Sequence, residues 1–326
     1  MNLPSLITPR VALQGIIPFQ TGAEVSLQCQ RDFVINKLML DVVLNCTGTG
    51  NWTAVNTLAP LSLLRRIAFG RNGKQDVVID GEILWFLNKM LDRVDPTITP
   101  PVVGSAVTGA YRAQAKIEFG LTDTDADWGR RALRYDAPGN QVLPSLSLLW
   151  GTVADVGTCG AGDEAITVAT TNCEVVAEQD LGLVYASKAD HQTLQVIAGQ
   201  PVLATTPRFV VPMDVRSNLQ AIFIKSELNG TPADGILNGV TALRSGSASL
   251  IQDVTIAHLR ARARRRFQMP GVWPAGFDVI WLPGDYGDRS HFLRAQEMAL
   301  SELVLELNVT GAAGNAISVY TVGYKL

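Results

Sequence analysis

Apolar and polar residues alternate with period two along much of this chain, which is the pattern of half-buried β-strands. Residues 38–44 and 303–309 show it most cleanly, with an apolar side chain at every second position. Further short runs of this kind follow in both halves, separated by clusters of Gly, Asn, Asp and Pro that favour turns. The pattern predicts an all-β protein of antiparallel sandwiches or barrels, with about eight strands and one helix in the first half.

One stretch of sequence occurs twice, at residues 71–87 and again at residues 244–259. Arg, Gly, a pair of apolar residues, Asp and Ile recur in register, and each copy predicts a turn, a short strand and a helix. The first helix should end near Asp92, and the second should cover about residues 254–267. Asp80 and Asp253 are candidate N-caps, because a carboxylate there accepts the unpaired amide hydrogens of the first turn. This duplication predicts two similar domains in tandem.

The domain boundaries follow from breaks in the strand pattern. Residues 1–20 contain Pro4, Pro9 and Pro18 and predict an irregular N-terminal arm. The first domain is expected over residues 21–182 and the second over residues 183–326. Within the second domain, residues 229–246 predict a glycine-rich loop.

Composition narrows the class of protein. The 326 residues carry a formal net charge of −3, which argues against nucleic-acid binding by the whole surface. Charged residues make up 17%, against roughly 25% in an average globular protein. Low charge and 29 glycines fit a β-rich protein whose surface is partly covered, either by copies of itself or only by its own short loops.

Cysteines and targeting signals indicate where the protein is made. The four cysteines are scattered without a C-x-x-C pair and lie far from the three histidines, so buried free thiols are expected rather than disulfides or zinc. Residues 1–14 lack the features of a signal peptide, and no apolar run reaches the roughly 18 residues of a membrane span. We therefore expect synthesis in the cytoplasm.

The second predicted helix carries the one conspicuous cluster of charge. Its five arginines are Arg260, Arg262, Arg264, Arg265 and Arg266. On a helix, Arg260 and Arg264 share a face, as do Arg262 and Arg266. Such a cluster can contact phosphates of nucleic acid or lipid, or it can form ion pairs with an adjacent subunit. The absence of interleaved aromatic residues favours a subunit interface or a solvated face.

Other candidate chemistry is weaker. No nucleophile, zinc-protease or phosphate-loop motif occurs. Asp123, Asp125 and Asp127 have the spacing of a calcium loop, but Arg134 stands where an EF-hand needs Glu. Trp85 is predicted to be a core residue, whereas the loop residues Trp52, Trp128 and Trp273 are left open as sugar-stacking candidates. Four glutamates could serve a glycosidase, although no pair is selected by spacing and exposed strand positions are expected: Glu82, Glu118, Glu174 and Glu178.

Two β-rich blocks, each with a helix after an early hairpin, resemble the double jelly-roll major capsid proteins of the PRD1–adenovirus lineage of icosahedral viruses. The resemblance spans most of the chain as a pattern of elements. It is carried by residues 61–67 leading into Asn72-Gly73 and 83–87, by residues 143–151, and by the closing hairpin of residues 303–324. The size is similar to that of the compact members from membrane-containing phages and archaeal viruses.

The resemblance implies two tandem eight-stranded jelly rolls, each with one inserted helix. Three chains would form a homotrimer with six barrels, and these pseudo-hexagonal tiles would cover an icosahedral virion shell, commonly over an internal lipid membrane. It implies no catalysis and no cofactor. The implied partners are further trimers, penton and minor capsid proteins and viral membrane lipids, without sequence-specific nucleic acid. Residues 96–109, 122–139 and 229–246 would face outward or toward neighbours, and the arm would reach the membrane or an adjacent trimer.

The sequence is also compatible with two functions of other classes. The first is a viral spike or glycan-binding β-sandwich protein that recognises sugars through loop aromatics. The second is a β-sandwich enzyme that acts on glycosides.

Overall fold

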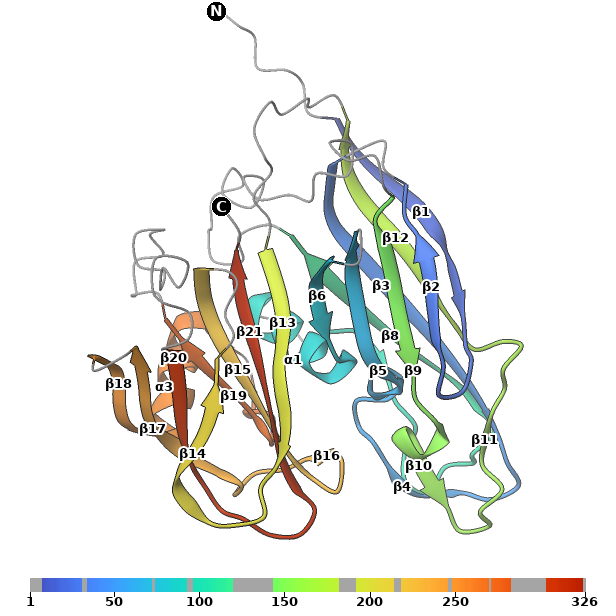
Figure 1. The fold of residues 1–326 in the computed structure, drawn as a ribbon. Helices are drawn as coiled ribbons and strands as arrows, with labels where there is room; N and C mark the ends of the chain where they lie inside the picture. The colour runs from blue at the N-terminus through green and yellow to red at the C-terminus, as the bar shows by residue number, and fades with distance from the viewer. Residues whose placement is uncertain are drawn as a thin grey trace, which may run out of the picture. The chain divides into compact units, whose positions relative to one another are not determined.

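The computed structural model describes residues 8–30, 34–71, 74–92, 96–119, 143–181, 192–213, 218–245, 248–269, 271–282 and 303–324. The chain divides into two compact units, unit 1 (Met1–Gln192) and unit 2 (Thr193–Leu326). Each unit is built from antiparallel strands and contains one α-helix among its described residues (Figure 1).

Unit 1 contains two sheets of antiparallel strands. The first has the order β1-β12-β3-β8-β7 and the second the order β2-β9-β5-β6. The strands are β1 (Thr8–Pro18), β2 (Glu24–Gln28), β3 (Val34–Thr47), β5 (Leu64–Arg71), β6 (Lys74–Ile79), β7 (Ile98–Thr99), β8 (Gly109–Glu118), β9 (Ser145–Trp150) and β12 (Asn172–Leu181). Short additions are β4 (Trp52–Val55) paired with β10 (Gly157–Cys159), β11 (Ala165–Ile166) on β3, and the 3-10 turns η1 (Leu61–Leu63) and η2 (Val153–Asp155).

Unit 2 repeats this plan. Its first sheet has the order β16-β15-β21-β13, with β19 also paired to β15, and its second has the order β14-β20-β17-β18. The strands are β13 (Gln192–Pro201), β14 (Thr206–Pro212), β15 (Asn218–Leu228), β16 (Thr231–Pro232), β17 (Leu237–Ser245), β18 (Ala248–Thr255), β19 (Phe277–Trp281), β20 (Leu303–Val309) and β21 (Asn315–Tyr324).

The two units have the same strand topology. In the order in which they lie in the sheet, β1, β12, β3 and β8 of unit 1 correspond to β13, β21, β15 and β19 of unit 2. Likewise, β2, β9, β5 and β6 correspond to β14, β20, β17 and β18. Two four-stranded sheets with this interleaved order form a jelly roll, so the predicted fold of two tandem eight-stranded jelly rolls is confirmed.

The duplicated sequence lies at equivalent places in the two units. In unit 1 it forms β5, β6 and helix α1 (Gly81–Asp92), and in unit 2 it forms β17, β18 and helix α3 (Ile256–Phe267) (Figure 1). The predicted order of a strand followed by a helix is therefore confirmed in both copies. Of the predicted turn residues, Asn72, Gly73 and Gly246 lie outside the described residues, and Ser245 is the last residue of β17.

The two helices are capped differently. Asp80 caps α1 as predicted, because its Oδ1 accepts a hydrogen bond from the amide of Ile83 at 2.8 Å. The prediction that Asp253 caps the second helix is wrong. Thr255 is the N-cap of α3, with its hydroxyl accepting from the amide of His258 at 3.3 Å, and Asp253 still belongs to β18. The helix therefore starts two residues later than expected.

Two segments predicted as irregular form strands. Residues 8–18, placed in the N-terminal arm, form β1, which pairs only with β12 at the edge of its sheet. An edge strand tolerates proline, so Pro9 and Pro18 do not prevent pairing. Residues 237–245, placed in a glycine-rich loop, form β17 in the interior of a sheet. In the pairing of β17 with β20, the register shifts between Leu237 and Gly239 and again between Val240 and Ala242, which hides the alternation from the sequence.

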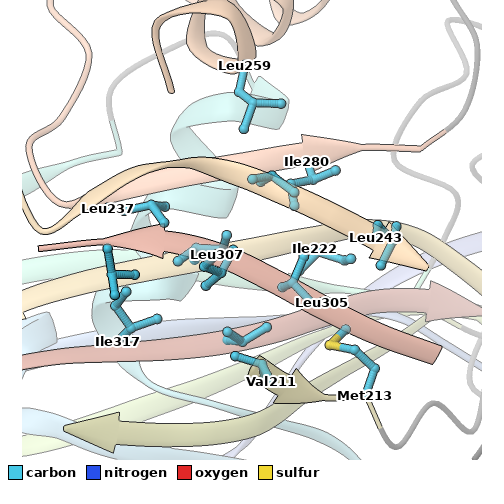
Figure 2. Close-up of a cluster of buried hydrophobic side chains, with 14 of the residues drawn as sticks. Val211, Met213, Ile222, Leu237, Leu243, Leu259, Ile280, Leu305, Leu307 and Ile317 are labelled. Atoms are coloured by element: carbon cyan, nitrogen blue, oxygen red, sulfur yellow. The ribbon is translucent and has the colours of Figure 1, made fainter. Parts of the chain in front are cut away.

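Each unit has its own apolar core. In unit 1, Phe19 packs edge-on against Trp150 and Phe69 packs against Phe119, with ring centroids 5.4 and 5.0 Å apart. In unit 2, side chains from both sheets and from α3 meet in one cluster, to which Leu259 adds the contribution of the helix (Figure 2). Leu305 and Leu307 in this cluster are fully buried, and each such side chain stabilises the fold by roughly 1.5–3 kcal/mol.

Candidate functional site

Helix α3 of unit 2 carries the arginine cluster predicted from the sequence. Its apolar side consists of Leu259, Ala263 and Phe267, which are buried. Phe267 meets Trp281 of β19 edge-on at a centroid distance of 4.9 Å. The 3.6-residue period therefore places these three side chains in the core and distributes the arginines around the rest of the helix.

Arg260 is the arginine that faces inward. Its Nε donates to Oδ1 of Asp278 at 2.6 Å, and its Nη2 donates to Oδ2 of Asp278 at 3.1 Å and to Oδ1 of Asp234 at 2.7 Å. Asp234 also accepts a hydrogen bond from the amide of Gly276 at 3.0 Å. Arg260 thus anchors α3 to strand β19 and to the segment before β17.

The electrostatics of this anchor are set by burial. Asp278 is 1% exposed, and desolvation raises its pKa to about 6 although the hydrogen bonds and charge of Arg260 oppose the shift. The two carboxylates hold the pKa of Arg260 above its ordinary value. Hydrogen bonds from Arg260 and Gly276 lower the pKa of the more exposed Asp234 against a desolvation effect that would raise it. The anchor is therefore structural, and its central carboxylate, Asp278, is not accessible to a partner.

The remaining arginines lie on the outer side of the helix. Arg262, Arg264 and Arg265 are exposed and Arg266 is half-buried. Within the described part of the chain, no carboxylate lies within ion-pairing distance of the three exposed guanidinium groups. The other exposed positions on α3 are Ala257, His258 and Ala261. We call this surface, residues 257, 258, 261, 262, 264 and 265, the basic face of α3.

The equivalent helix of unit 1 has no such face. Every residue of α1 from Gly81 to Met90 is buried, including Glu82, Asn88 and Lys89. Glu82 accepts from the side-chain amide of Asn56 at 2.9 Å. Asn88 bonds both the carbonyl and the amide of Lys116 on β8, at 2.8 and 2.7 Å. Over these ten residues, α1 therefore has no exposed face.

The candidate catalytic glutamates are divided among α1, β8 and β12. Glu82 is buried on α1, which differs from the exposed strand position expected for it. Glu118 and Glu178 form ion pairs with Lys116 at 2.7 Å and with Lys37 at 2.6 Å. Glu174 is exposed on β12. Glu118 and Glu178 both lie opposite Lys37 in the strand register, and both carboxylates are held in ion pairs with lysines.

The tryptophans considered for sugar stacking are mostly inaccessible. Trp52 and Trp273 are 1% and 6% exposed, and Trp85 is a core residue as predicted. Trp128 and the candidate calcium residues Asp123, Asp125 and Asp127 lie outside the described residues.

Near the start of α3 there is a hollow of about 160 Å³. Its lining residues, Asn238–Thr241, Asp253–Thr255 and Asn308, include no aromatic side chain that could stack on a sugar.

All four cysteines are free and buried, as predicted. The sequence spacing did not suggest that Cys159 would approach two carboxylates, which it does through a tight turn. Its Sγ donates to Oε2 of Glu164 at 2.9 Å and to Oδ1 of Asp163 at 3.5 Å. Hydrogen bonds from Thr49 lower the pKa of Asp163, and the bond from Cys159 lowers the pKa of Glu164. Cys159, Asp163 and Glu164 thus form a polar cluster, with their ligand atoms within 4.8 Å of one another. Neither described helix is long and apolar enough to cross a membrane.

Solved structures with the same fold are viral capsid proteins. The MCP of STIV (Sulfolobus Turreted Icosahedral Virus) aligns with a TM-score of 0.75 and 12% identity, over 98% of this chain and 97% of that one. The PBCV-1 virus capsid protein aligns with a TM-score of 0.68 and 14% identity, over 99% and 95%. The major capsid protein P2 from bacteriophage PM2 aligns with a TM-score of 0.58 and 11% identity, over 98% of each chain.

These likenesses establish the fold and extend over both units. The neighbours are double jelly-roll proteins, and the alignments cover nearly the whole of each chain. No family model matches the sequence, and no curated protein matches it either.

Proposed function

We propose that this chain is a major capsid protein that forms pseudo-hexagonal homotrimers and tiles an icosahedral virion shell. The observation that carries the proposal is the near-complete alignment of both jelly rolls with capsid proteins from Sulfolobus Turreted Icosahedral Virus, bacteriophage PM2 and PBCV-1. The role is structural rather than catalytic, and its place is the virion.

The topology supplies a physical reason for a trimer. Each chain contributes two jelly rolls with the same strand order and with the helix at the same place. Three chains related by threefold symmetry then present six similar barrels, which fit a site surrounded by six neighbours. One sequence can therefore cover a large closed surface by repeating a symmetric tile.

The finer parts of the proposal rest on the family resemblance. The shell would enclose a lipid membrane, and its vertices would be closed by penton and minor capsid proteins. The proposed domains are jelly rolls over residues 21–182 and 183–326, with the first extended to include strand β1 (Thr8–Pro18), which belongs to its sheet. Lipid extraction from purified particles tests the membrane, because a shell without phospholipid would contradict it.

Light scattering coupled to size-exclusion chromatography tests the trimer. The chain has a mass of 35.1 kDa, so a homotrimer should elute with a mass of about 105 kDa. Negative-stain microscopy of the same fractions should show pseudo-hexagonal particles or shells. A chain that stays monomeric at all concentrations, and binds a glycan array instead, would identify it as a spike or sugar-binding protein.

A further inference from the structure

The two equivalent helices differ in how completely the chain covers them. Both lie between the corresponding strands of their jelly rolls, after β6 in unit 1 and after β18 in unit 2. Helix α1 is buried over its first ten residues, whereas α3 leaves six of its twelve residues exposed. If the two barrels occupy similar positions in a tile, the exposed side of α3 must be buried by contact with another molecule.

The composition of the basic face indicates which kind of molecule makes this contact. The twelve residues of α3 include five arginines and no acidic residue. A helix exposed to solvent usually carries both acidic and basic residues, so that side chains three and four positions apart can form ion pairs. Here the three exposed arginines lack carboxylate partners among the described residues, so pairing with another molecule is open to them. Guanidinium groups suit this because they bind carboxylates at two points.

A second copy of the chain has the complementary charge. The whole sequence has 27 Lys and Arg and 30 Asp and Glu. Subtracting the five arginines of α3 leaves 22 basic and 30 acidic residues, a net charge of −8 for the rest of the chain. The basic face of one copy is thus attracted to the remaining surface of another, and such complementarity steers association and fixes its register.

Other polyanions fit this surface less well. A helix that lies on a membrane inserts an apolar side rich in Trp, Phe or Leu, but the apolar side of α3 is already in the core. Single-stranded nucleic acid is held by aromatic side chains interleaved with basic ones, and the basic face has none. Small residues at Ala257 and Ala261 allow a protein surface to approach the helix closely.

We propose that the basic face of α3 is the contact through which one copy of the chain docks on a second copy, with Arg262, Arg264 and Arg265 pairing with carboxylates of that copy. This inference rests on the proposed function and names the surface that holds the homotrimer together. The contact is head-to-tail, since the basic face meets a different surface of the neighbour, and a threefold rotation closes it into a ring.

The test is charge reversal on the full chain. Arg262→Glu with Arg265→Glu should leave the circular dichroism spectrum unchanged, because both side chains are exposed. The dissociation constant of the trimer should rise by roughly a hundredfold, as expected when two favourable ion pairs become repulsive. Lys74→Glu is the matched control, since Lys74 is exposed on β6 of unit 1, and it should assemble like the wild type. Arg262→Gln with Arg265→Gln removes the charge without repulsion and replaces the reversed pair if that fails to fold.

The outcomes separate the two proposals. A folded monomeric variant beside a trimeric wild type and control supports the basic face as the docking surface. Wild-type-like assembly of the reversed and the neutral variants overturns it, and loss of binding to anionic vesicles or single-stranded RNA in those variants would then assign the face to that ligand. A wild type that never assembles would instead overturn the proposed capsid function.

Discussion

Arg260 of α3 and Asp278 of β19 form a two-point ion pair, with Nε donating to Oδ1 at 2.6 Å and Nη2 to Oδ2 at 3.1 Å. Strand β19 corresponds to β8 of unit 1, where Asn88 of α1 holds the backbone of Lys116. Each jelly roll therefore ties its helix to the same strand by a polar side chain. In unit 2 the tie is ionic and buried, which makes its removal costly.

We expect Arg260→Ala to destabilise unit 2 by about 3 kcal/mol or more at neutral pH, because it leaves the buried carboxylate of Asp278 without its partner. The midpoint of urea unfolding, followed by tryptophan fluorescence, measures the loss. Arg262→Ala on the same helix is the control and should change stability by less than about 0.5 kcal/mol, since that side chain is exposed. Equal effects of the two variants would contradict the assignment of Arg260 as the anchor.

Asp278 should also make stability depend on pH. Its pKa is about 6 in the folded chain, against an ordinary value of 3.8. Between these two values the folded chain holds a proton that the unfolded chain has released. The free energy of unfolding therefore falls as pH rises through this window, by roughly 3 kcal/mol in all, and the loss is complete above about pH 6.

Asp278→Asn isolates this effect, because its side chain is neutral at every pH. The quantity to measure is the free energy of unfolding of the variant minus that of the wild type. This difference should increase from about pH 4 to about pH 7, because only the wild type loses stability as Asp278 ionises. Other carboxylates titrate in both proteins and cancel in the difference. A difference that stays constant over this range would show that Asp278 has an ordinary pKa.

The separate roles of the five arginines could not be predicted from their spacing. The repeated stretch correctly indicated a helix, but helical spacing grouped Arg260 with Arg264, which is exposed. What distinguishes Arg260 is its contact with Asp278 and Asp234, which lie 18 and 26 residues away in sequence. Tertiary pairing of this kind leaves no local signal. The duplicated strand and helix, by contrast, were predictable because local periodicity encodes them.

The two strands that were predicted as irregular segments were missed for a similar reason. Proline at positions 9 and 18 indicated an irregular arm, and only the sheet order reveals that β1 is an edge strand on which proline is tolerated. Gly239 indicated a loop, although it lies in β17 where a Cβ would stand 2.6 Å from the carbonyl oxygen of Val254. Glycine at this position permits a close approach between strands, and sequence alone does not distinguish that from a turn.

Three of the four thiols should be chemically inert in the folded protein. Burial raises the pKa of Cys29 and Cys46 to about 12 and also raises that of Cys173, and these residues are at most 2% exposed. At about pH 8 the nucleophilic thiolate is scarcely populated, and reagents cannot reach it. Ellman's reagent should label none of the three in the native chain and all of them in urea. In Cys159→Ser, fast native labelling would contradict the burial of the other thiols.

The helix caps give a last prediction, which follows from the correction at Asp253. Asp80→Ala and Thr255→Ala each remove an oxygen that accepts a first-turn amide, and each should lower the unfolding free energy by about 1 kcal/mol. Asp253 has no such role and has a φ of +49°, in the left-handed region where a side chain is strained.

Asp253→Gly should therefore leave stability unchanged or raise it by up to about 1 kcal/mol, because glycine adopts this φ without strain. Urea unfolding of the three variants beside the wild type measures the contrast. If Asp253→Gly lost as much stability as Thr255→Ala, the carboxylate would be capping α3 after all, and the two copies of the repeat would begin their helices in the same way.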